Sequence, residues 1–234
     1  MILVGGSHAT AIRQAARSMG VDLNFHVFHR NSPLWPSGKE LFQPEFLAEF
    51  NGLEGTIFSS LGGNSHNVMG LIEHRAPFDF VHPRIKTKAK TDDDRTWVPF
   101  SAVKQSIEQT AGTFLRLLQG FAERYPGRVV HLQSPPQIED ETFIRQGIVD
   151  KGTDARKTGL AKFGIAPAAL RYKLWRLNSE IFEERCAELG VKFVPVPSAS
   201  ITRSGFLKRK YWGDPTHANA AYGKLVLEQM RQHA

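Results

Sequence analysis

Met1-Ile2-Leu3-Val4-Gly5-Gly6-Ser7-His8 opens the chain with a short apolar run that ends at a pair of glycines. Consecutive apolar residues before a glycine turn are typical of a strand buried on both faces of a parallel sheet. The segment 9–19 follows directly; it is rich in alanine, and its apolar residues recur at intervals of three and four up to Gly20. A buried strand that leads straight into a helix favours an α/β fold.

The same alternation continues along the chain. It predicts strands over 1–4, 23–29, 55–61, 128–134 and 191–196, and helices over 9–19, 39–50, 101–125, 168–189 and 216–232. Strands that alternate with helices predict a doubly wound, five-stranded parallel sheet with helices on both faces. We expect one domain over residues 1–234.

Two segments interrupt this pattern, at about 74–100 and 137–165. The first is irregular and longer than an ordinary connection, which favours a lid or a substrate loop. The second is polar and punctuated by glycines, and we expect it to cover the site from the other side.

Composition narrows the class of protein. With 234 residues, 41% of them apolar, the chain can bury one substantial core. No apolar run is long enough to span a membrane, and the N-terminus has no basic segment typical of a signal peptide. The single cysteine, Cys186, excludes an internal disulfide and is expected on a helix. We therefore expect a cytoplasmic protein without a membrane partner.

The formal charge of +7 raises the question of nucleic acid binding. The basic residues are scattered along helical stretches, and no nucleic-acid-binding motif is present. The basic run 84–90 is followed at once by three aspartates at 92–94, which indicates a solvated loop. No nucleic acid partner is expected, and attraction to an anionic substrate is the milder alternative.

Polar side chains that can act together follow three of the predicted strands. Ser7 follows the first strand, Asn64 follows the third in a Gly62-Gly63-Asn64 turn, and Asp214 and His217 come after the fifth. The C-terminal ends of parallel strands share one edge of the sheet, where sites form. There, Asp214 could accept a proton from His217, leaving the other ring nitrogen as a general base for Ser7. The side-chain amide of Asn64 could stabilise an oxyanion.

Each of these residues also has a structural interpretation. Ser7 could cap a helix, Asn64 could sit in a left-handed turn, and Asp214 could cap the last helix with Pro215 in its first position. Taken singly, these interpretations are as good as catalysis or better. Only catalysis accounts for all of the residues together.

A metal site is the other alternative, because His8, His66 and His217 would converge at the same strand ends. No HxH or HExxH spacing is present, so no metal or other cofactor is expected. His8 and His66 are expected to pack or to hydrogen-bond around the pocket.

On these motifs the chain resembles the SGNH (GDSL-like) hydrolase superfamily. Gly5-Gly6-Ser7-His8 matches the first conserved block, Gly63-Asn64-Ser65-His66 the third, and Asp214-Pro215-Thr216-His217 the last. The resemblance implies a flavodoxin-like α/β/α sandwich and a Ser7–His217–Asp214 triad. It also implies an oxyanion hole formed by the Ser7 N–H, a glycine N–H and the Asn64 side chain.

The chain departs from the family pattern at two positions, since Gly6 and Ser65 stand where the family usually has aspartate. The glycine of the second block has no clear motif, and Gly38 is its best positional match. The aspartate that the family has at the position of Gly6 is not a triad member, so the implied chemistry is retained.

The function expected from these residues is that of a serine esterase or acylhydrolase. It would cleave a short acyl or acetyl ester of a small molecule or glycan through a Ser7 acyl-enzyme. Two alternatives stay open: an O-acyltransferase that uses the same triad on a sugar hydroxyl, and a catalytically silent glycan-binding domain. The sequence does not indicate the oligomeric state.

Overall fold

The computed structural model describes residues 1–28, 35–36, 40–85 and 94–234. Its centre is a five-stranded sheet in the order β2-β1-β3-β6-β7, and every neighbouring pair of strands is parallel. The strands are β1 (Ile2–Gly5), β2 (Asn24–Val27), β3 (Ile57–Ser60), β6 (Val129–Leu132) and β7 (Lys192–Val194). This strand order is that of flavodoxin-like doubly wound sheets. The predicted five-stranded parallel sheet is therefore confirmed.

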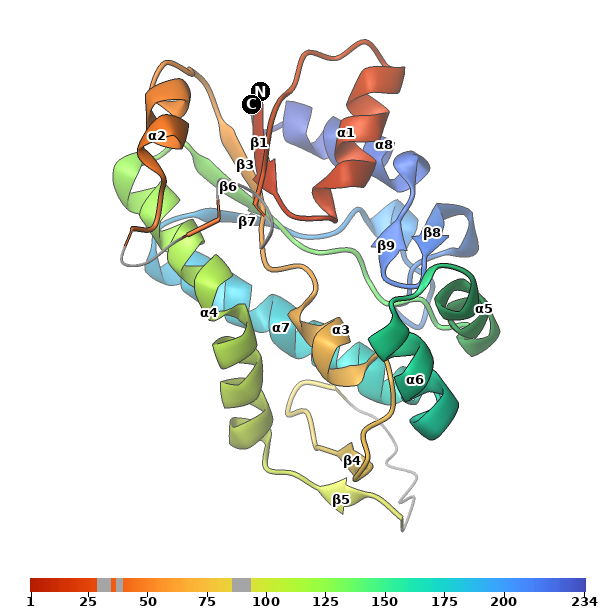
Figure 1. The fold of residues 1–234 in the computed structure, drawn as a ribbon. Helices are drawn as coiled ribbons and strands as arrows, with labels where there is room; N and C mark the ends of the chain where they lie inside the picture. The colour runs from red at the N-terminus through yellow and green to blue at the C-terminus, as the bar shows by residue number, and fades with distance from the viewer. Residues whose placement is uncertain (29–34, 37–39, 86–93) are drawn as a thin grey trace.

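Helices cover both faces of the sheet (Figure 1). On one face lie α1 (Ala9–Ser18) and α8 (Ala220–Arg231), and on the other lie α2 (Pro44–Phe50), α4 (Phe100–Arg124) and α7 (Ala168–Glu188). The short helix α3 (Ser65–Gly70) follows β3 and contacts α4 and α7. The fold is the three-layer α/β/α sandwich that the sequence predicts.

The apolar residues of the strands alternate between the two faces of the sheet and pack against the helices on each. Ile2 and Val4 of β1 pack with α2, α4 and α7, whereas Leu3 packs with α1 and α8. In β3, Ile57 packs with α2, α4 and α7, whereas Phe58 packs with α1 and α8, because successive side chains of a strand point to opposite faces. This explains why the first strand is an unbroken apolar run.

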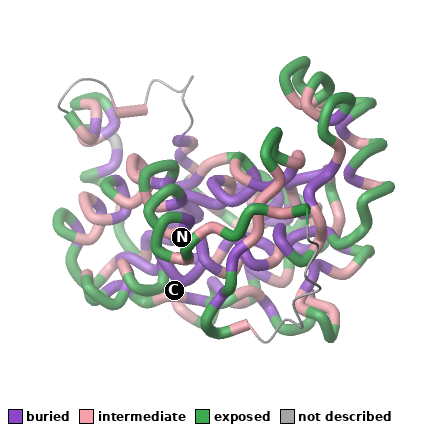
Figure 2. The backbone as a smooth tube through the Cα atoms, turned by 90° about the horizontal axis from the view of Figure 1, so that it is seen from below, coloured by how far each residue is buried: buried purple, intermediate pink, exposed green. Residues whose placement is uncertain are grey.

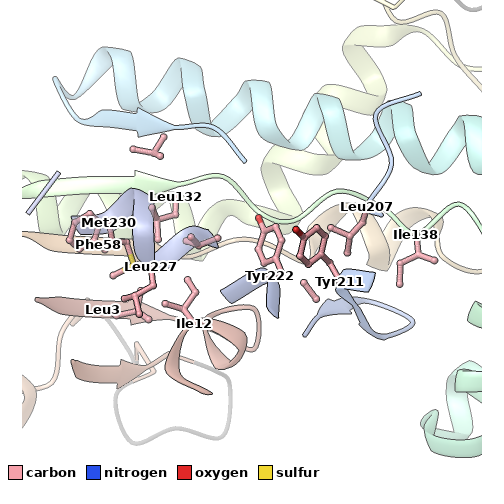
Figure 3. Close-up of a cluster of buried hydrophobic side chains, with 14 of the residues drawn as sticks. Leu3, Ile12, Phe58, Leu132, Ile138, Leu207, Tyr211, Tyr222, Leu227 and Met230 are labelled. Atoms are coloured by element: carbon pink, nitrogen blue, oxygen red, sulfur yellow. The ribbon is translucent and has the colours of Figure 1, made fainter. Parts of the chain in front are cut away.

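The layer between the sheet and the α1–α8 pair is shown in Figure 3, where Leu3 and Phe58 of the strands meet Ile12 of α1 and Leu227 of α8. In Figure 2 the buried backbone runs through the middle of the molecule and the exposed residues lie on the outer turns of the helices. Within the described ranges, no helix is long and apolar enough to cross a membrane.

The segment 74–100 forms two short parallel strands, β4 (Phe78–Asp79) and β5 (Thr96–Trp97), with residues 86–93 outside the description. It is anchored to α7 by an ion pair between Asp79 and Lys173 and by a contact of His82 with Glu180 at 3.4 Å. The described part of this segment therefore packs against α7.

The segment 137–165 contains two helices, α5 (Glu141–Lys151) and α6 (Asp154–Phe163), where the sequence had indicated only a polar connection. Each helix has a side-chain cap: Asp140 accepts a hydrogen bond from the Phe143 N–H, and Thr153 accepts one from the Arg156 N–H. Capping residues at these positions are the signal that favours helices here. Gly147 of α5 lies so close to the Pro215 ring that a Cβ at this position would stand 2.6 Å from it.

Between β7 and α8 the chain forms the 3-10 helices η1 (Ser198–Ser200) and η2 (Arg209–Tyr211) and a small antiparallel hairpin. The hairpin consists of β8 (Trp212–Asp214) and β9 (His217–Ala218). In Figure 1 it lies beside α5.

Candidate active site

The site lies where the direction of strand order reverses. From β1 the chain moves outward to β2 and then returns to β3 on the other side of β1. Ligands of doubly wound sheets bind at such a switch point, beyond the carboxyl ends of the strands. Ser7 lies in the turn after β1, and Asn64 lies in the turn after β3. The two strands are neighbours, which brings these turns together.

Three of the predicted site residues form one continuous chain of hydrogen bonds. Nε2 of His217 lies 2.7 Å from Oγ of Ser7. Nδ1 of the same ring lies 2.9 Å and 2.8 Å from the two carboxylate oxygens of Asp214. Because the carboxylate can only accept, Nδ1 carries the proton and Nε2 is free to accept one from Ser7. The expected contact between Ser7 and His217 is present.

The β8–β9 hairpin fixes the geometry of Asp214 and His217, which are paired across its two strands. Oδ1 of Asp214 also accepts the backbone N–H groups of Thr216 at 2.9 Å and His217 at 3.0 Å. The backbone of this tight turn therefore holds the carboxylate in place independently of its contact with the imidazole ring. This arrangement explains their spacing of three residues.

The interpretation of Asp214 as the cap of the last helix is wrong. Helix α8 begins at Ala220 and not at residue 216, and its cap is Asn219, whose Oδ1 accepts from the N–H groups of Ala221 at 2.9 Å and Tyr222 at 3.2 Å. The Asp214 carboxylate is already occupied by the hairpin turn. His217 accordingly lies on a strand and not in the first turn of a helix.

Ser7 is exposed and does not cap α1 with its side chain. His8 occupies the cap position of that helix, without a side-chain hydrogen bond to it, and the Ser7 hydroxyl meets His217 instead. The structural interpretation of Ser7 as a helix cap is therefore wrong as well.

Asn64 is held with its amide group available as a donor. Its Oδ1 accepts a hydrogen bond from Nδ2 of Asn67 at 2.8 Å, which fixes the carbonyl side of the amide. Nδ2 of Asn64 has no acceptor among the described residues. The left-handed turn proposed as the alternative is made by Gly62, at φ +74°, whereas Asn64 has φ −121°. Asn67, three positions further on, orients this amide, and no motif in the sequence indicated that role.

Gly63 gives His8 room to pack against the site. A Cβ on Gly63 would stand 2.4 Å from Cδ2 of His8, so a larger residue would require the His8 ring to shift. The His8 ring contacts the His217 ring with centroids 4.8 Å apart at a tilt of 52°. Burial, followed by the neighbouring His217 and His66 rings, holds the pKa of His8 well below its usual value. Burial also lowers the pKa of His66 to about 3, so both rings are neutral at physiological pH.

The electrostatic state of Asp214 follows from its partners. Burial alone would raise the pKa of this carboxyl, but hydrogen bonds from His217 and Thr216 outweigh it and lower the pKa to about 2. Asp214 is therefore ionised throughout the physiological range and can stabilise an imidazolium on His217.

Other candidates for the chemistry fit less well. Cys186 is buried in α7, as the sequence predicts for a helix residue, and burial raises the pKa of its thiol to about 12. The described ranges contain no group of three His, Cys, Asp or Glu side chains that could hold a metal ion. Gly38, the proposed source of an oxyanion donor, lies outside the described residues.

A pocket of about 690 Å³ opens beside Ser7. It reaches from the turns after β1 and β3 to the side of α4, and its lining residues are Gly6, Ser7, His8, Thr10, Val27, Phe28, Trp35, Ser60, Gly62, Gly63, Asn64, Ser65, Val68, Thr110, Thr113 and Phe114. The wall contributed by α4 could not be identified from the sequence, because its residues carry no motif. No described residue of the 74–100 segment lines this pocket.

Fold and site together define a three-layer α/β/α protein with a hydrogen-bonded serine, histidine and aspartate at the switch point of its sheet. No family model matches the chain, and no curated protein matches it. The structure is similar to a GDSL-like lipase from Bacteroides thetaiotaomicron, at 12% identity and a TM-score of 0.47, over 99% of this chain and 85% of that one. It is also similar to Est24, a carbohydrate acetylesterase from Sinorhizobium meliloti, at 14% identity and a TM-score of 0.41, over 100% of this chain and 99% of that one.

Proposed function

We propose that the protein is a serine esterase in which Ser7 is the nucleophile, His217 the general base and Asp214 the residue that orients the base. The continuous hydrogen-bonded chain from Ser7 to Asp214, open to a pocket at its serine end, carries this proposal. The same geometry in unrelated folds activates a serine for attack on a carbonyl.

In the acylation step, Oγ of Ser7 bonds to the carbonyl carbon of an ester while His217 Nε2 takes the hydroxyl proton. The carbonyl oxygen becomes an oxyanion. We assign the Nδ2 of Asn64 and the backbone N–H of Ser7 as the donors that stabilise it. When the tetrahedral intermediate collapses, the carbon–oxygen bond to the alcohol breaks, and His217 returns its proton to the departing oxygen.

In the deacylation step, water takes the place of the alcohol. His217 accepts a proton from the water as its oxygen bonds to the acyl carbon, and Ser7 leaves with that proton. The products are the acid and the free enzyme, so no cofactor is needed. A sugar hydroxyl could replace water in this step, which would make the protein an acyltransferase.

The test is turnover of p-nitrophenyl acetate by the wild type, Ser7→Ala and Ser101→Ala, the last an exposed serine on α4 that serves as a matched control. We expect release of p-nitrophenol by the wild type and the control, and only background release by Ser7→Ala. A wild type that turns over no ester would refute the esterase. Acetyl transfer to an added sugar at a rate above hydrolysis would identify a transferase.

A further inference from the structure

We propose that the pocket beside Ser7 binds the acyl half of the substrate and is built for an uncharged acyl chain of several carbons. This inference rests on the proposed esterase function and adds the substrate class and the residues that select it.

The position of His217 decides which half of the ester enters the pocket. The departing alcohol must lie within hydrogen-bonding reach of Nε2 of His217, because that nitrogen returns the proton. His217 lines no part of the pocket that the described residues form, whereas Ser7 and Asn64 both do. Its ring borders a separate small cavity with Pro136 and Pro215. With the alcohol at His217 and the oxyanion at Asn64, the remaining substituent of the acyl carbon points into the pocket.

The wall of the pocket is suited to an aliphatic chain. Its larger side chains are apolar or aromatic, and Trp35 and Phe114 meet edge to face with centroids 5.4 Å apart. The polar side-chain groups of the described lining residues are hydroxyls, one imidazole, one amide and the indole N–H of Trp35, and no Asp, Glu, Lys or Arg is present among them. Among the described lining residues, a charged acyl group would lose its hydration and meet no side chain of opposite charge.

The size of the pocket argues for more than an acetyl group. A volume of about 690 Å³ lies within the range of pockets that enclose whole drug-sized ligands. An acetyl group would leave most of this apolar space unfilled. Each further methylene buried there should raise kcat/KM by about fourfold until the chain reaches the wall of α4.

The experiment measures kcat/KM for p-nitrophenyl acetate, butyrate, hexanoate and octanoate. These esters share one leaving group, so the series varies only the acyl half. For the wild type we expect a rise of about 16-fold for each pair of added carbons until the pocket is filled. A p-nitrophenyl ester that ends in a carboxylate should react at least tenfold more slowly than the uncharged ester of equal chain length.

Two variants test the wall on α4, and a third is the matched control. Thr113→Trp places a large ring in the pocket and should lower the ratio of hexanoate to acetate kcat/KM by tenfold or more. Phe114→Ala removes apolar surface and should also lower this ratio. Gln109→Trp adds the same ring at an exposed position of the same helix, outside the pocket, and should leave the ratio as in the wild type.

The outcomes separate this inference from the proposed function. If acetate is hydrolysed through Ser7 but kcat/KM stays flat or falls from acetate to octanoate, the acyl pocket is wrong and the esterase stands. The acyl pocket is also wrong, and the esterase stands, if Thr113→Trp and Gln109→Trp change the ratio equally. It is wrong as well if Thr113→Trp selectively slows the hydrolysis of acetylated sugars, since the pocket would then hold the alcohol. If no ester is hydrolysed, the esterase itself is wrong.

Discussion

Replacing Asp214 by asparagine tests the orientation of the base without removing the side chain. Oδ1 of Asp214 accepts two backbone N–H groups of the hairpin turn, at 2.9 Å and 3.0 Å. An asparagine would keep its carbonyl oxygen in that place, because an amide NH2 cannot accept these bonds. Its NH2 group would then lie where Oδ2 is now, 2.8 Å from Nδ1 of His217.

That exchange reverses the tautomer of His217. The NH2 group can only donate, and it would be the group nearest to Nδ1; the carbonyl oxygen, 2.9 Å from Nδ1, already accepts two backbone N–H groups. We therefore expect Nδ1 to accept from the NH2 group and the ring proton to move to Nε2. Nε2 lies 2.7 Å from the Ser7 hydroxyl and would donate to it, where the mechanism needs it to accept. The expected loss in kcat is about 10⁴-fold, the size of effect known for this exchange in a Ser–His–Asp triad.

The assay is kcat for p-nitrophenyl acetate at pH 7.5, measured for the wild type, Asp214→Asn and Asp154→Asn. Asp154 is exposed in the first turn of α6 and serves as the control for a lost negative charge. Thermal unfolding of the three proteins shows whether each is folded. A folded Asp214→Asn protein that loses less than tenfold in kcat would refute the assigned role of Asp214.

Three other changes have expected outcomes of their own. Asn64→Ala should lower kcat by about 10²–10³-fold with little change in KM, because it removes one oxyanion donor; an effect on KM alone would contradict this. Gly63→Ala forces a Cβ to within 2.4 Å of the His8 ring, and should destabilise the protein by about 1–3 kcal/mol in urea unfolding; unchanged stability would show that the His8 ring can move aside. The carboxyl of Asp214 has its pKa lowered from 3.8 to about 2, so its ionised form stabilises the folded state above about pH 4, and this contribution is lost as the pH falls towards 2. Because the Asp214 side chain is 46% exposed, we discount this stabilisation and expect the wild type to be about 1 kcal/mol more stable than Asp214→Asn at pH 7. In unfolding measurements this difference in stability should narrow below pH 4. A difference that stays constant with pH would contradict the lowered pKa.

The layers of the fold could be predicted from the sequence because the patterns that indicate its strands and helices are local. Short apolar or alternating runs predict the strands. Helical periodicity predicts α1 and α4, and a long stretch without glycine or proline that ends at Gly190 predicts α7, each to within a residue or two at its ends. The two helices of segment 137–165 were missed because their periodicity is weak. Their caps at Asp140 and Thr153 were the available signal.

The candidate site was predictable only in part. The residues after β1, β3 and β7 could be assigned to one edge, because parallel strands end together. The sequence alone could not decide whether Asp214 caps a helix or closes a hairpin turn, since in both cases its carboxylate accepts backbone N–H groups. Asn219, which lies directly before an alanine-rich helical segment, is the residue that would have resolved it.

The pocket wall and the packing of His8 depend on contacts between distant segments. Phe114 reaches the site because α4 crosses the face of the sheet beside α3, and no local pattern encodes that approach. His8 contacts His217 across more than two hundred residues of sequence, in a space that Gly63 leaves open. Such contacts follow from packing and could not be derived from spacing along the chain.

The proposed mechanism requires Ser7 to be the nucleophile that His217 activates. The most direct measurement is mass spectrometry of the protein after reaction with a fluorophosphonate, followed by mapping of the modified residue. We expect one phosphonyl group on Oγ of Ser7 in the wild type and none in His217→Ala under the same conditions. An unmodified protein, or an adduct on Ser65 in place of Ser7, would contradict this assignment.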